Sequence, residues 1–249
     1  MSHIASALAQ VQERIAAAAR RSGRKSEEIQ LMAVSKFHDV DEILQAYAAG
    51  QRLFGENRVQ EAASKFQALT QKYPDINLHL IGTLQRNKAK QVPGLFSCVQ
   101  SVDRDEILVE LSRRAVALGM RIDILLEMHT GEESKAGYPD AEALFRAADL
   151  AVSLPGIRVR GLMTMAPYTG DEKPIRASFR TLVWARDTLV SRLPQDDWSN
   201  LSMGMTNDYE IAVEEGSTLV RVGTAIFGSR PIAVPGQQLV SDGSGETLS

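Results

Sequence analysis

Cysteine is almost absent from this 249-residue chain, and charge of neither sign is in large excess. The single cysteine, Cys98, excludes an internal disulfide, which is typical of proteins in a reducing compartment. Basic residues number 28 against 31 acidic ones, so the formal net charge is −3. That balance gives no electrostatic reason to expect a nucleic acid or a membrane surface as a partner.

Long apolar runs are missing as well. No stretch approaches the roughly 18 apolar residues of a transmembrane helix. Gln12, Glu13 and Arg14 interrupt the N-terminal region where a signal peptide would need an unbroken apolar segment. We therefore expect a cytoplasmic protein with no membrane partner.

What remains is an ordinary globular composition, 44% hydrophobic and 24% charged. After an amphipathic N-terminal helix, apolar segments rich in β-forming residues alternate with segments of helical periodicity. The expected strands span 29–35, 52–55, 77–82, 97–102, 122–128, 159–165, 200–203 and 218–222. The expected helices between them span 40–49, 58–72, 85–90, 105–118, 141–152, 175–193 and 208–215.

Strands that alternate with helices predict a parallel sheet. Eight such strands in about 250 residues, with an extra N-terminal helix, favour a single closed (β/α)8 barrel of the TIM type over an open sheet. Residues 1–230 are expected to form this α/β domain, and residues 231–249, rich in Gly, Ser and charge, a flexible tail. We expect the isolated barrel to be a monomer.

In such a barrel the functional site lies at the carboxyl ends of the strands. Lys36 follows the first strand directly, after an apolar run that should be buried. A lysine in low-dielectric surroundings has a lowered pKa and can act as a nucleophilic amine. Taken alone, this segment is explained better by a lysine that extends to solvent from a strand end.

The last two strands change that balance, because phosphate sites in these barrels are often built from the loops that follow them. Ser202 lies at the end of the seventh expected strand and Thr206 follows it, and Gly223 and Thr224 follow the eighth. Glycines allow close approach of the backbone to an anion, and hydroxyls add hydrogen-bond donors. An ordinary turn would explain either loop alone, but explains the two together less well.

A reactive lysine combined with a phosphate cradle indicates a phosphorylated carbonyl compound, for which pyridoxal 5′-phosphate (PLP) is the obvious candidate. Arg221, just before the cradle, would then contact the pyridine nitrogen. An arginine there keeps the nitrogen unprotonated, so the ring is a weak electron sink and carbanion chemistry is disfavoured.

The cysteine and the histidines do not indicate another kind of site. Cys98 lies in an apolar strand and is interpreted as a small buried hydrophobe. His79 is either a group near the ligand or a hydrogen-bonded core histidine, and the sequence does not decide between them. No metal-ligand spacing is present among the four histidines: His3, His38, His79 and His129.

Several segments together resemble the pyridoxal phosphate homeostasis protein family, whose fold is like the barrel domain of alanine racemase. The matching segments are AVSK (33–36), FGENRVQEA (54–62), HLIGTLQRNKAK (79–90), SVDR (101–104), GEESKAG (131–137), RGLMTMAP (160–167), LSMGMTND (201–208) and GSTLVRVGTAIFGSR (216–230). They span nearly the whole chain in the family's order. The sequence departs from the pattern at Arg58, Leu78 and His129, where tyrosine, tryptophan and asparagine are common.

The resemblance implies PLP held as a Schiff base on Lys36. It implies a pyridine contact from Arg221 and a pocket position for Asn57. The implied phosphate contacts are Ser202, Thr206, Gly223 and Thr224. Lys135 is a further candidate for an anion contact at the mouth, although a solvated loop lysine explains it more simply.

Three functions fit these residues. The first is a PLP carrier rather than an enzyme, which acts in vitamin B6 homeostasis and supplies PLP-dependent apo-enzymes as its candidate partners. The second is an amino-acid racemase, which needs an acid/base group on each face of the substrate. Alanine racemase takes its second group from a C-terminal domain that we do not expect here, which leaves Tyr168 as the tyrosine to test. The third is a barrel that binds another phosphorylated ligand without covalent chemistry.

Overall fold

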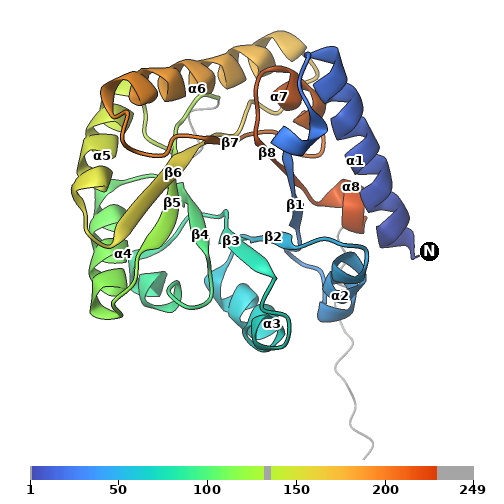
Figure 1. Cartoon of the computed structure of the whole chain (residues 1–249), viewed down its shortest axis with the longest axis horizontal. Helices are drawn as coiled ribbons and strands as arrows, with labels where there is room; N and C mark the ends of the chain where they lie inside the picture. The colour runs from blue at the N-terminus through green and yellow to red at the C-terminus, as the bar shows by residue number, and fades with distance from the viewer. Residues whose placement is uncertain (1, 132–135, 229–249) are drawn as a thin grey trace, which may run out of the picture.

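The computed structural model describes residues 2–131 and 136–228, so the expected tail at 231–249 lies outside the described residues. Eight parallel strands form a closed barrel in sequence order, and β1 pairs with β8 to complete it (Figure 1). The strands are β1 (Gln30–Val34), β2 (Leu53–Glu56), β3 (Asn77–Leu80), β4 (Cys98–Val102), β5 (Ile122–Glu127), β6 (Ile157–Met163), β7 (Asn200–Ser202) and β8 (Leu219–Val222). The predicted TIM-type barrel is confirmed.

Helices surround this barrel. They are α1 (His3–Arg21), α2 (Val40–Ala48), α3 (Val59–Lys72), α4 (Asp105–Ala117), α5 (Ala141–Ser153), α6 (Glu172–Arg192), α7 (Tyr209–Glu214) and α8 (Thr224–Phe227), with short 3₁₀ helices η1 (Ser26–Glu28) and η2 (Arg86–Gln91). None of the helices in the described ranges is both long and apolar enough to cross a membrane.

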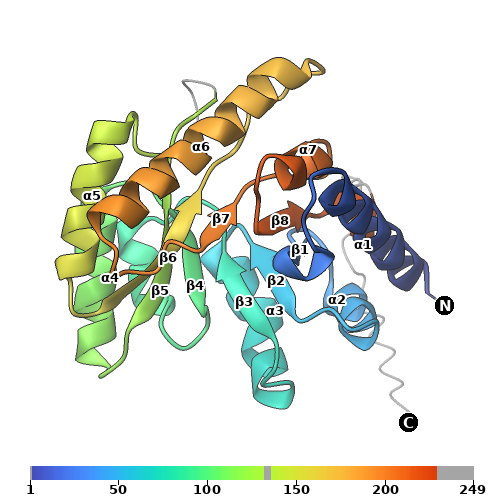
Figure 2. The same cartoon turned by 45° about the horizontal axis from the view of Figure 1, so that its top comes forward.

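The extra helix α1 completes the outer layer. The helix that follows β8 is only one turn long, and α1 lies beside α8, α7 and α2 (Figure 1 and Figure 2). Its basic C-terminal end binds protein groups: Arg21 pairs with Glu210 and Glu214, and Arg24 donates to the carbonyls of Val213 and Ser217. These residues therefore tie α1 to α7, an arrangement that the composition of the helix alone did not predict.

Two expected helices differ in detail. The segment expected at 85–90 forms the 3₁₀ helix η2 and not an α-helix. Helix α6 begins at Glu172, three residues before the expected start, because the Asp171 side chain caps it by accepting from the Lys173 amide. Pro174 lies in the first turn, where a helix does not need the missing N–H.

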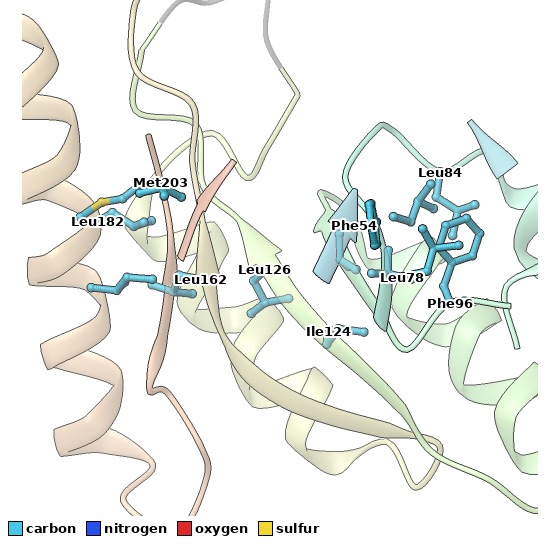
Figure 3. Packing of buried hydrophobic residues seen from close by; sticks show 14 of the residues in the cluster. Phe54, Leu78, Leu84, Phe96, Ile124, Leu126, Leu162, Leu182 and Met203 are labelled. Atoms are coloured by element: carbon cyan, nitrogen blue, oxygen red, sulfur yellow. The ribbon is translucent and has the colours of Figure 1, made fainter. Parts of the chain in front are cut away.

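The main apolar core lies between the barrel and its helices. Figure 3 shows Leu162 and Met203, from the region of β6 and β7, against Leu182 of α6. Phe54, Leu78 and Phe96 pack together on another side of the barrel. With this layer outside the strands, the barrel interior is left to a mixture of apolar and polar side chains, and the latter form the floor of the site described below.

Gly161 of β6 lies at a register shift relative to β5 and packs closely against β7, which gives a stability prediction. Its φ is +144°, and a Cβ there would overlap the Asn200 backbone. We expect Gly161→Ala to lower the free energy of unfolding by about 3 kcal/mol, because overpacking and backbone strain both act. Urea denaturation measures this, with Gly170→Ala as the control, since nothing lies within 4 Å of a Cβ there. Equal stability of the two variants would contradict the prediction.

Candidate functional site

A cavity of about 680 Å³ opens at the carboxyl ends of the strands. Its wall is formed by residues that end or follow β1, β2, β3, β5, β6, β7 and β8. Six of the seven residues predicted to bind the cofactor lie in that wall: Lys36, Asn57, Thr206, Arg221, Gly223 and Thr224. The fold therefore brings into one cavity groups that lie as far apart in the sequence as the first and the last strand.

Lys36 lies in the turn that joins β1 to α2, one residue beyond the buried Ser35. It is neither fully buried nor fully exposed. The next residue, Phe37, has a left-handed φ of +69°, which is uncommon for a bulky side chain. The amine is thus carried by a backbone segment in a defined and unusual conformation, at the rim of a pocket.

Asn57 follows β2 and lies against the β3 loop. A Cβ on Gly82 would overlap the backbone carbonyl of Asn57, so these two pocket residues touch through their backbones. Only glycine permits this approach, which fixes the width of the cavity on the side of β2 and β3.

The loops after β7 and β8 form the side predicted to hold a phosphate. Gly204 has a φ of +96°, and its carbonyl accepts from the Arg221 amide at 2.9 Å, so the loop after β7 is held against strand β8. Thr206 lies in the first loop, and Gly223 precedes the one-turn helix α8. The first N–H groups of a helix have no partner within it, so Thr224 and Ala225 supply backbone donors beside two threonine hydroxyls.

Arg221 reaches the cavity floor from β8 with only 4% of its surface exposed. Its Nη1 donates to the Ser202 hydroxyl at 2.6 Å, and its Nη2 donates to the Thr164 carbonyl at 2.8 Å. Burial lowers the pKa of Arg221 to about 10, while the charges of Glu127 and Asp208 oppose that shift. The guanidinium therefore stays charged at neutral pH, with its planar group fixed by two acceptors.

Ser202 is the one predicted contact that does not line the cavity. Its hydroxyl is fully buried, accepts from Arg221 and donates to Gln100 Oε1 at 2.6 Å. The Ser202 side chain, which was expected to contact a phosphate, thus holds the Arg221 guanidinium in place by a hydrogen bond inside the barrel. Strand β7 ends at Ser202, whose side chain points into the barrel, whereas the loop residues beyond it form the pocket wall.

The hydrogen bonds that run from Arg221 through Ser202 to Gln100 continue to His79. Gln100 Nε2 lies 2.8 Å from His79 Nδ1, inside the barrel and below the cavity. Burial lowers the pKa of His79 to about 4, so the ring is neutral at physiological pH. His79 is a partly buried, hydrogen-bonded histidine that does not line the cavity, which favours the second of the two interpretations that the sequence left open.

Glu127 was missed. It ends β5, lines the cavity and has 2% of its surface exposed. Burial raises its pKa to about 7; the nearby charge of Asp103 acts in the same direction and Arg221 opposes it. Strand five was expected to end beside His129, but it ends at Glu127, and His129 does not line the cavity. The available signal was an acidic residue inside the expected strand, one position before its end at 128.

Glu127 and His79 predict how stability depends on pH in the absence of ligand. Between its ordinary pKa of 4.5 and about 7, Glu127 is neutral when folded and ionised when unfolded, so its contribution to stability falls as pH rises. Between about 4 and the ordinary 6.5, His79 is neutral when folded and protonated when unfolded, so its contribution rises.

The two slopes oppose each other, and Glu127→Gln removes one of them. From pH 4.5 to 6.5, we expect the variant to gain about 3 kcal/mol of unfolding free energy relative to the wild type, at about 1.4 kcal/mol per pH unit. Urea titrations at several pH values measure the difference. Parallel pH profiles for the two proteins would show that Glu127 titrates normally.

Three candidates from the sequence remain: Cys98, Lys135 and Tyr168. Cys98 is buried inside the barrel with Leu125 and Met163, and burial raises the pKa of its thiol. Lys135 lies outside the described residues. Tyr168 lines the cavity but is 82% exposed. No group of three metal-ligating side chains occurs within residues 2–131 and 136–228.

Known proteins share this architecture. The family model for the alanine racemase N-terminal domain matches residues 7–231. The pyridoxal phosphate homeostasis protein of Vibrio alginolyticus is 42% identical over 84% of this chain and 90% of its own length. The protein of that name from Vibrio cholerae is 40% identical, over 87% and 92%.

Solved structures agree. PipY of Synechococcus elongatus, determined with PLP bound, is 38% identical with a TM-score of 0.79, over 90% of this chain and 100% of that one. Alanine racemase of Clostridium difficile is 13% identical with a TM-score of 0.70, over 88% of this chain and 57% of that one, and shows likeness of fold alone. This chain therefore belongs to the alanine racemase N-terminal domain family and, within it, to the pyridoxal phosphate homeostasis proteins.

Proposed function

We propose that this protein binds PLP in the cavity, holds it as a Schiff base on Lys36, and acts in the cytoplasm as a carrier that supplies PLP to apo-enzymes. The observation that carries the proposal is the convergence of Lys36, Arg221 and the loops with Thr206 and Gly223 on one cavity. The relationship to the homeostasis proteins and to PLP-bound PipY supports the same ligand.

The donor set fits PLP. Lys36 supplies a primary amine, Arg221 a charged donor, and the two loops supply hydroxyls and backbone N–H groups for a phosphate dianion. When bound, the cofactor supplies an electrophilic carbonyl carbon. Arg221 stays protonated, so it offers hydrogen bonds to a pyridine nitrogen without giving up its proton. This disfavours carbanion chemistry and supports storage over turnover.

A transfer assay tests the carrier role. The PLP-loaded protein is mixed with an apo-aminotransferase, and recovery of aminotransferase activity is followed with and without a phosphatase that destroys free PLP. We expect activation to persist in the presence of the phosphatase, while an equal amount of free PLP loses its effect. Activation that disappears with the phosphatase would show that the protein only releases PLP into solution.

Racemisation is the second candidate, because two further acid/base groups line the cavity. Tyr168 lies on the loop after β6, and Glu127 has a pKa near neutrality. The interconversion of L- and D-alanine by the purified protein, lost in Lys36→Ala, would favour an enzyme over a carrier.

A further inference from the structure

A buried lysine lies behind the turn that carries Lys36. Lys65, on the inner face of α3, is only 9% exposed, and a lysine is rarely buried unless it is paired. Its Nζ lies 2.7 Å from Glu56 and 3.0 Å from Glu61. It also donates to two backbone carbonyls of the turn, Ser35 at 2.9 Å and His38 at 3.3 Å.

Glu56 joins this ammonium group to β1 and β2. It is the last residue of β2 and is fully buried. Its Oε1 accepts from the Ser35 hydroxyl at 2.6 Å and from Lys65. Burial raises the pKa of Glu56, and the contacts with Lys65 and Ser35 oppose that shift. Oε2 has no hydrogen-bond partner among the described residues, so the carboxylate depends on these two contacts.

The middle of the turn is held by Glu61. Its Oε1 accepts from the Phe37 amide at 2.7 Å and also contacts Lys65. Phe37 needs such support, because a left-handed φ costs a bulky residue about 1–2 kcal/mol. Its side chain is 43% exposed, so core packing alone does not hold it. The His38 amide closes the turn onto the Ser35 carbonyl at 3.1 Å.

These contacts bind the turn on both sides of Lys36. Ser35, Phe37 and His38 each bond to Glu56, Glu61 or Lys65, and none of those three charged residues lines the cavity. A buried ion pair seldom stabilises a fold more than an apolar pair of the same volume would. The three N–H groups of the Lys65 ammonium are shared among four acceptors. Lys65 is therefore not available as the cofactor lysine either.

We propose that Lys65 and Glu56 are positioning residues that hold the 35–38 turn in the conformation from which Lys36 reaches PLP. The inference rests on the proposed function, since it takes Lys36 to be the cofactor lysine. Placement of a reacting group matters steeply, because an error of about 1 Å can cost 10²-fold in rate.

The test replaces the pair by an apolar one, in the double variant Lys65→Met/Glu56→Met, so that no lone buried charge remains. The matched control is Lys72→Met, on the exposed end of the same helix. Without PLP, hydrogen exchange of the Phe37 amide reports on the turn. With PLP, the rate at which the Schiff-base absorbance appears reports on Lys36. We expect faster exchange and a rate about 10²-fold lower in the double variant only.

The outcomes separate this inference from the proposed function. A double variant that forms the band at the wild-type rate, with a protected Phe37 amide, overturns the positioning role while PLP binding stands. If the wild type forms no Schiff-base band with PLP, the proposed function itself is wrong. If the double variant does not fold, Ser35→Ala decides: it removes only the hydroxyl contact with Glu56. Slower band formation than in Lys72→Met supports the inference, and an unchanged rate overturns it.

Discussion

Lys36→Ala is expected to abolish the visible absorbance that PLP acquires on binding this protein. The variant keeps Arg221, Thr206 and Gly223 in the wall of the cavity, so PLP should still bind there, but weakly and without a covalent bond. Absorbance spectra with added PLP, before and after borohydride, measure the effect. The wild type should show a band that borohydride removes, and Lys36→Ala should show only the spectrum of free PLP.

The control for this experiment is Lys72→Ala, which removes an exposed lysine on α3. It should match the wild type in band position and intensity. An undiminished band in Lys36→Ala would place the Schiff base on another lysine, and the absence of a band in all three proteins would favour a different phosphorylated ligand.

Arg221→Leu is expected to have the largest effect on stability. It removes donors to Ser202 and Thr164 and leaves Glu127 without the cation that faces it. Loss of two hydrogen bonds from a buried charged donor, with both acceptors left buried, costs about 3–5 kcal/mol in all. Urea denaturation at pH 7.5 should therefore show a loss of that size, and PLP binding should weaken as well.

Glu127→Gln supplies the internal check. If the cost of Arg221→Leu comes partly from the unpaired carboxylate, Glu127→Gln should raise the stability of the Arg221→Leu protein by more than it raises the stability of the wild type. Strictly additive effects of the two substitutions would mean that Arg221 and Glu127 do not interact in the folded protein.

The barrel was predictable because each strand is a short apolar run between helical segments, and the rule that sites lie at strand ends then selected Lys36 and Arg221. Side-chain direction was harder to predict. Successive side chains in a strand point to opposite faces, and β5 ends at Glu127, one residue before the expected end at 128. An error of that size is enough to exchange a residue that lines the cavity for one that does not.

Hydrogen bonds and ion pairs between residues far apart in the sequence could not be predicted either. The hydrogen bond from Ser202 to Gln100 joins residues 102 positions apart. Lys65 and Glu56 are ordinary in the sequence, since α3 was expected to be amphipathic and Glu56 belongs to a recognised motif. Only the closed barrel shows that they meet behind the turn of Lys36. Such pairs depend on the rotation of each strand and helix, which periodicity does not fix to the residue.

The most direct test of the central claim is to map the reduced adduct. The wild-type protein is loaded with PLP, treated with borohydride, digested and analysed by mass spectrometry. We expect one modified peptide, with the mass of the reduced cofactor on Lys36. Modification of another lysine in place of Lys36, or of no lysine, would contradict the assignment of the cavity as a covalent PLP site.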